Sequence, residues 1–71
     1  MENFKIGDKI YCVDNNDYEL NLTLHKEYVV KDITENYLIY IIDDLNNQEK
    51  WGMFRFISLK EYRLLKIKEI L

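Results

Sequence analysis

The chain has 71 residues, of which 48% are hydrophobic and 32% charged, and this length allows one small domain. The composition is typical of a folded protein with a thin core and excludes a disordered tail. A formal net charge of −3 disfavours a dedicated duplex-binding protein, because such proteins are usually basic.

The number of cysteines and the lengths of the apolar runs indicate in which cellular compartment the protein is expected. Cys12 is the single cysteine and cannot form an internal disulfide. The first residues lack the apolar stretch of a secretory signal. The longest apolar run, residues 38–42, is far shorter than the about 20 residues that span a bilayer. We therefore expect a cytoplasmic location and no membrane partner.

The N-terminal part of the chain begins with a turn and a strand. Gly7 beside Asp8 predicts a tight turn in which the glycine takes a positive φ, and residues 9–13 have the composition of a strand. The short polar side chains of residues 14–17 favour turns. Apolar and polar side chains alternate over residues 18–24, which predicts a half-buried arm of a long loop.

Two further segments, residues 27–33 and 37–42, are β-branched and aromatic and predict strands. Both faces of the second are apolar, so we expect it to be central and covered on both sides. After a polar turn at residues 43–47, residues 49–56 predict another strand, in which Gly52 indicates a bulge or a sharp bend.

In the C-terminal segment, residues 58–71, the spacing of apolar residues no longer follows the alternation of a strand. Ser58 and Glu61 have the spacing of a capping box, which predicts a helix from Leu59. Apolar side chains lie all around this helix rather than in one stripe. Either the helix ends after two turns and continues as an extended arm, or the surplus apolar face forms an oligomer interface, for which we expect the residues Leu64, Ile67 and Leu71.

Closely spaced strands followed by a short helix predict a mainly β fold, a small bent antiparallel sheet or five-stranded barrel over residues 1–57 with a C-terminal helix over residues 58–71. Several segments resemble small SH3-like barrels, including short ones encoded by phages and bacteria. They are the opening residues 4–11, the acidic loop at residues 14–19 and the strands at 27–30 and 37–43. The resemblance covers residues 4–57. The chain lacks the Ala-Leu-Tyr-Asp-Tyr motif and the groove proline with which eukaryotic SH3 domains bind proline-rich peptides.

Each residue that could take part in catalysis or metal binding also has a purely structural interpretation. Cys12 in a strand reads as a small buried hydrophobe, and His25 as an exposed turn residue. The adjacent carboxylates Asp43 and Asp44 read as solvated turn residues. Two Cys or His residues are too few for structural zinc, and the acidic loop departs from the calcium-loop pattern. We therefore expect no enzyme activity, no cofactor and no metal.

Two segments have the composition of a contact surface. The loop at residues 14–19 concentrates negative charge next to a tyrosine, which favours a partner with a basic surface. The segment 51–56 gathers large apolar side chains, of which at least one must belong to the core. The expected protein-binding residues are Asp14, Asp17, Tyr18, Glu19, Trp51 and Phe54.

The sequence favours a non-enzymatic module that masks a surface of a partner protein and forms a homodimer or higher oligomer. The resemblance implies a phage or bacterial accessory protein acting in the cytoplasm of a bacterial host, as an inhibitor of a host defence or CRISPR-type nuclease complex. The alternative is a nucleic-acid or nucleotide-binding barrel that contacts phosphates through basic side chains. Those residues are Lys50, Arg55, Lys60 and Arg63.

Overall fold

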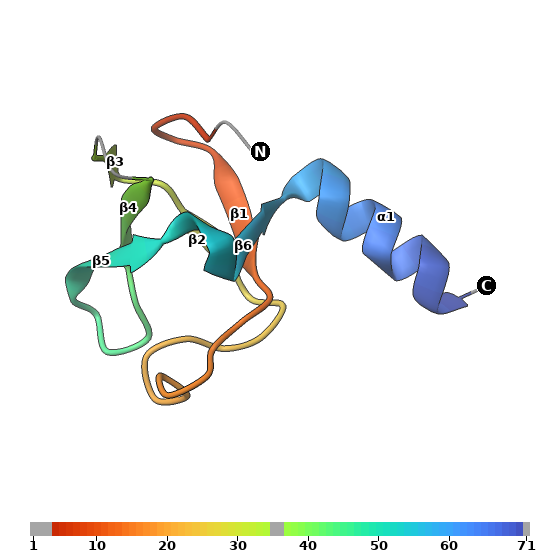
Figure 1. The fold of residues 1–71 in the computed structure, drawn as a ribbon, viewed down its shortest axis with the longest axis horizontal. Helices are drawn as coiled ribbons and strands as arrows, with labels where there is room; N and C mark the ends of the chain where they lie inside the picture. Colours follow the sequence, from red (N-terminus) through yellow and green to blue (C-terminus); the bar gives the residue numbers. More distant parts are fainter. Residues whose placement is uncertain (1–3, 35–36, 71) are drawn as a thin grey trace.

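The computed structural model describes residues 4–34 and 37–70 (Figure 1). The elements in chain order are β1 (Lys9–Cys12), β2 (Glu27–Val29), β3 (Asp32–Ile33), β4 (Leu38–Ile42), β5 (Gln48–Gly52), the 3-10 helix η1 (Met53–Arg55), β6 (Phe56–Ser58) and α1 (Leu59–Ile70). The strands form two three-stranded antiparallel sheets, in the orders β2-β1-β6 and β3-β4-β5. The prediction of a mainly β fold with a C-terminal helix is confirmed. Within the described residues, no strand pairing closes the two sheets into a barrel.

The segment 27–33, which we predicted as one strand, is two strands that belong to different sheets. The amide of Val30 donates to the carbonyl of Asp8 at 2.9 Å, whereas the amide of Lys31 donates to the carbonyl of Tyr40 at 2.8 Å. The backbone therefore changes partners between two consecutive residues. This crossing carries the chain from the first sheet to the second, and it divides the expected strand.

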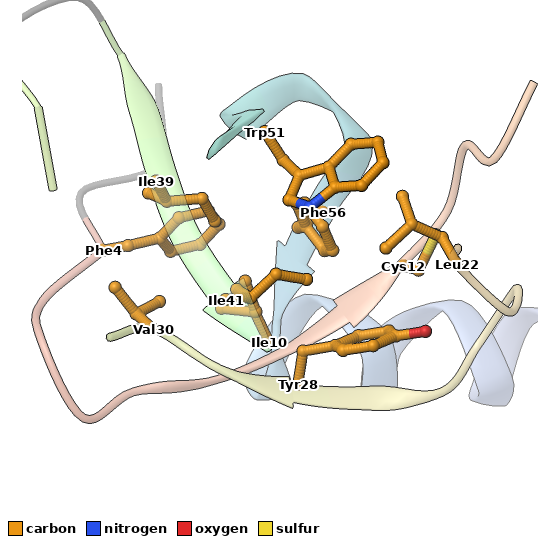
Figure 2. Close-up of a cluster of buried hydrophobic side chains, with 10 residues drawn as sticks. All are labelled: Phe4, Ile10, Cys12, Leu22, Tyr28, Val30, Ile39, Ile41, Trp51 and Phe56. Carbon is orange, nitrogen blue, oxygen red and sulfur yellow. The ribbon is translucent and has the colours of Figure 1, made fainter. Parts of the chain in front are cut away.

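The core lies between the two sheets (Figure 2). Inward side chains alternate with outward ones along the strands, as β1 shows with buried Ile10 and Cys12 on either side of half-buried Tyr11. The buried apolar residues are Phe4, Ile10, Cys12, Leu22, Tyr28, Val30, Ile39, Ile41, Trp51 and Phe56. Ten such side chains make a small core, as expected for a chain of this length.

Strand β4 is central in its sheet, as predicted, but it is not covered on both sides. Ile39 and Ile41 are fully buried, whereas Ile42 on the opposite face is 37% exposed and Tyr40 is half-buried. The reason is that the molecule has two layers of sheet, so each sheet has one inner face. The expectation of cover on both faces is therefore wrong.

The segment 18–24 is also different from its prediction. It forms turns rather than an extended arm, because the amides of Asn21 and Leu22 both donate to the carbonyl of Tyr18 at 2.9 Å. Only Leu22 of its leucines is buried, while Leu20 is 82% exposed and Leu24 is 48% exposed. Alternation indicates a buried face only in an extended chain, which this segment is not.

The structure agrees with the predictions of a turn at Gly7, a bend at Gly52 and a helix from Leu59. Gly7 has a φ of 95° in the turn before β1, and the sharp bend expected at Gly52 is the turn η1 that follows it. Helix α1 begins at Leu59, where the Ser58 Oγ accepts a hydrogen bond from the Glu61 amide at 3.1 Å. The helix continues to Ile70, so the alternative of an extended arm is wrong.

Helix α1 is attached to the sheets by its first turns and projects away from them (Figure 1). Its Tyr62 ring stacks on the Tyr11 ring of β1, with centroids 4.2 Å apart and planes 5° from parallel. In the part of the chain that is described, no helix is both long and apolar enough to cross a membrane.

Candidate functional site

An open groove of about 430 Å³ lies at the end of the molecule opposite α1, and we call it the docking groove. Tyr18 comes to it from the loop between β1 and β2, Leu38 from β4, Trp51 from β5 and Phe54 from η1. The edge of the Tyr18 ring meets the Trp51 ring at 88°, with the centroids 4.9 Å apart. The structure therefore unites the two segments that the sequence offered as separate contact surfaces.

Three predicted aromatic residues have different positions in this groove. Trp51 is only 7% exposed and belongs to the core, so it forms part of the floor. Tyr18 is 43% exposed and Phe54 is 70% exposed. The exposed aromatic side chains of the groove are therefore Tyr18 and Phe54, while Trp51 lies beneath them.

Arg55 connects the loop to η1. Its guanidinium carbon lies 4.9 Å from the Tyr18 ring centroid and 5.1 Å from the Phe54 ring centroid. Its Nη1 donates to the carbonyl oxygens of Asp14 at 3.2 Å and Asn16 at 3.3 Å, and it lies 3.5 Å from the Asp14 carboxylate. Stacking and hydrogen bonding together hold both exposed aromatic rings in place.

The acidic loop does not present all its charges to solvent in the same way. The Asp14 carboxylate faces Arg55 and accepts a hydrogen bond from the Asn16 amide at 3.0 Å, so an internal cation compensates it. Asp17 and Glu19 are exposed. Asp17 also has a φ of 70°, a left-handed conformation that aspartate tolerates better than most residues. The outward negative charge of the loop is therefore that of Asp17 and Glu19.

Asp43, which we expected to be solvated, is 4% exposed. Its carboxylate accepts hydrogen bonds from the amides of Leu45 at 3.0 Å and Asn47 at 3.1 Å, and from the Asn21 side chain at 3.2 Å. The solvated interpretation of this residue is wrong, because a distant loop folds over it. Asp43 thereby fixes the turn between β4 and β5 against the loop that carries Tyr18.

Asp44 makes a second connection between the same two segments. It accepts hydrogen bonds from the Thr23 hydroxyl at 2.6 Å and the Tyr28 hydroxyl at 2.9 Å, and it pairs with the Lys26 ammonium at 2.5 Å. Burial opposes ionisation of this carboxyl, but these donors outweigh burial and lower its pKa below the ordinary value. Burial raises the pKa of Tyr28 to about 12, and its bond to Asp44 adds to the shift. This network anchors the loop, so the edge of the groove rests on a rigid support.

Cys12 and His25 have the environments expected from the sequence. Cys12 is fully buried in β1, and burial raises the pKa of its thiol. A raised pKa makes the thiolate scarce at neutral pH. His25 is exposed in a turn, with its ring 5.8 Å from the Tyr62 ring. Among the described residues, no group of three or more His, Cys, Asp or Glu side chains is placed to hold a metal ion.

The residues of the nucleic-acid alternative do not form one surface. Lys50 and Arg55 both line the docking groove, where Arg55 Nη1 donates to the carbonyl oxygens of residues 14 and 16. Lys60 and Arg63 are exposed on α1, on the other side of the molecule (Figure 1).

Six lining residues of the groove were not among the predicted contact residues, namely Asn21, Leu38, Asp43, Asn47, Glu49 and Gly52. They come from the loop between β1 and β2, from β4, from the turn that follows it and from β5, and nothing in their local sequence marks them as neighbours. Of the expected oligomer residues, Leu64 and Ile67 are 51% and 52% exposed on α1, and Leu71 is outside the described residues. Comparison with known proteins adds no relative, since no family model, no curated protein and no solved structure matches this chain.

Proposed function

We propose that the chain is a non-enzymatic binding module with an SH3-like fold, which masks a surface of a partner protein through the docking groove. The two sheets and the crossing at residues 30 and 31 support this fold, because a strand that bends from one sheet into another is how small β-sandwiches and barrels turn a corner. The short turn η1 between β5 and β6 then brings Phe54 to the groove.

The observation that carries the proposal is the exposed Phe54 ring on a rigid support. The ring lies against Gly52, where an added Cβ would be 2.5 Å from its Cε1 atom, and beside the Arg55 guanidinium. An aromatic side chain that is exposed yet held in one position loses little entropy on binding, and such residues are the usual anchors of interfaces. Tyr18 beside it enlarges the apolar contact.

Charge around the groove favours a partner with a basic surface. Asp17 and Glu19 are exposed in the loop. Inside the groove, Glu49 and Lys50 carry opposite charges, and the charge of Arg55 is balanced by Asp14, so the excess of negative charge is that of the loop. Complementary charge accelerates encounter and selects among partners more than it adds affinity. The proposed partner surface therefore combines an apolar pocket for Phe54 with surrounding lysine or arginine side chains.

A pull-down from the native host tests this function, with nuclease-treated lysate and two matched variants. Phe54→Ala removes the proposed anchor, and Ile6→Ala removes an apolar side chain that is 65% exposed outside the groove. We expect one protein to be retained after nuclease treatment, lost with Phe54→Ala and kept with Ile6→Ala. Retention that requires nucleic acid, or that is indifferent to Phe54, contradicts the proposal.

A further inference from the structure

Helix α1 carries a stripe of four side chains, Glu61, Leu64, Leu65 and Lys68, which we call the helix stripe. Their spacing of three and four residues places them on one helical face. Together with Val13 and Ile57 they line a largely apolar groove of about 420 Å³. Leu64 is 51% exposed there, so a substantial apolar surface is open to solvent.

The attachment of α1 to the sheets uses a different face of the helix. Tyr62 stacks on Tyr11, and the Lys66 ammonium lies 5.5 Å from the Tyr62 ring centroid. Tyr62 and Lys66 are one turn apart, about 130° around the helix axis from the centre of the helix stripe. Packing through Tyr62 therefore leaves Leu64 half-exposed on the helix stripe, while Leu65 is half-buried beside Val13 and Ile57.

The order of charges along the helix stripe points to its occupant. Glu61 is at the N-terminal end, Lys68 is at the C-terminal end, and the two leucines lie between them. When two copies of such a stripe meet around a two-fold axis between positions 64 and 65, each leucine meets a leucine and each Glu61 meets a Lys68 of the other copy. A parallel arrangement would instead oppose like charges, which is unfavourable.

We propose that the helix stripe binds the helix stripe of a second copy of this chain, as an antiparallel helix pair with Leu64 and Leu65 at its centre. The Val13 and Ile57 side chains beside the helix extend the apolar contact beyond α1. A helix of 12 residues is about 18 Å long, so the interface is small and the dimer is reversible. This proposal does not depend on the docking groove, which lies at the other end of the molecule.

Sedimentation velocity of the purified chain, from about 1 µM to about 1 mM, tests the proposal together with two charge reversals. Glu61→Lys and Lys68→Glu each place like charges at both ends of the antiparallel pair. We expect each variant alone to dimerise at least about tenfold more weakly than the wild-type chain. An equimolar mixture of the two variants restores opposite charges at both contacts, so the mixture is expected to form a heterodimer.

Arg63→Glu is the matched control, because it makes the same change of charge as Lys68→Glu on an exposed position of α1 outside the helix stripe. It is expected to dimerise as the wild-type chain does. A wild-type chain that remains monomeric throughout the concentration range overturns the proposal. A dimer that persists in both single variants, or variants that fail to pair in the mixture while the wild-type chain dimerises, also overturns it.

Discussion

Arg55 is the side chain on which the shape of the docking groove depends. Arg55→Lys keeps the positive charge but loses the planar group that stacks between Tyr18 and Phe54 and reaches two carbonyl oxygens. We expect it to lower the free energy of unfolding by about 1 to 2 kcal/mol, as measured by urea denaturation. Amide hydrogen exchange in the loop at residues 14–24 is expected to accelerate as well. Arg63→Lys on α1 is the control, and equal effects of the two variants would contradict this role.

Tyr28 gives the molecule a defined response to alkaline pH. Its folded pKa of about 12 lies above the unfolded value of 10.0, so its contribution to stability is complete below pH 10 and is lost as the pH rises towards 12. Tyr28→Phe removes its bonds to Asp44 and to the Thr23 amide, which is expected to cost about 1 to 2 kcal/mol at pH 7.

Urea unfolding of the wild-type chain and Tyr28→Phe at pH 7, 10 and 11.5 checks this expectation. The difference between the two is expected to stay constant up to about pH 10 and then to shrink. A difference that remains constant to pH 11.5 would show that Tyr28 ionises equally in the folded and unfolded chain.

At the scale of elements, alanine substitutions at the two glycines are expected to have opposite effects: one weakens partner binding and the other lowers stability. Gly52→Ala places a Cβ 2.5 Å from the Phe54 ring, so this exposed ring must turn out of the position in which Gly52 and Arg55 hold it. We expect a change in stability below about 1 kcal/mol and a loss of partner binding of about tenfold. Gly7→Ala meets no atom within 4 Å but strains a backbone φ of 95°, so it is expected to cost about 1 kcal/mol and to leave binding unchanged. Urea denaturation and a binding titration distinguish the two, and the reverse pattern would be contrary to this assignment.

Local signals in the sequence were sufficient where the determining contacts are local. The start of α1 follows from Ser58 and Glu61, which are three residues apart, because the Ser58 hydroxyl accepts the hydrogen bond from the Glu61 amide that a capping box predicts. The position of Asp43 did not follow, because its partner Asn21 is 22 residues away in the chain. The same holds for the docking groove, whose lining residues come from separate segments that only the tertiary fold brings together. The division of the 27–33 strand likewise depends on partners in two sheets.

The whole molecule has a sheet body with the docking groove at one end and α1 projecting from the other (Figure 1). An antiparallel pair through the helix stripe would therefore leave both docking grooves open. Two linked grooves bind more tightly than one groove to a surface that presents several copies of the partner, because the second contact is intramolecular. We expect the Glu61→Lys variant to keep its affinity for a single immobilised partner at low density and to lose avidity at high density, as measured by surface plasmon resonance. Equal losses at both densities would contradict this division of roles.

The central claim is that Phe54 contacts a partner protein, and site-specific photo-crosslinking in host cells tests it most directly. A benzophenone-bearing amino acid at position 54 is expected to give, on irradiation, one covalent adduct with a protein that survives nuclease treatment. The same group at position 6, where the native side chain is 65% exposed outside the groove against 70% for Phe54, is expected to give none. No adduct from position 54, or an adduct with nucleic acid alone, would contradict the account.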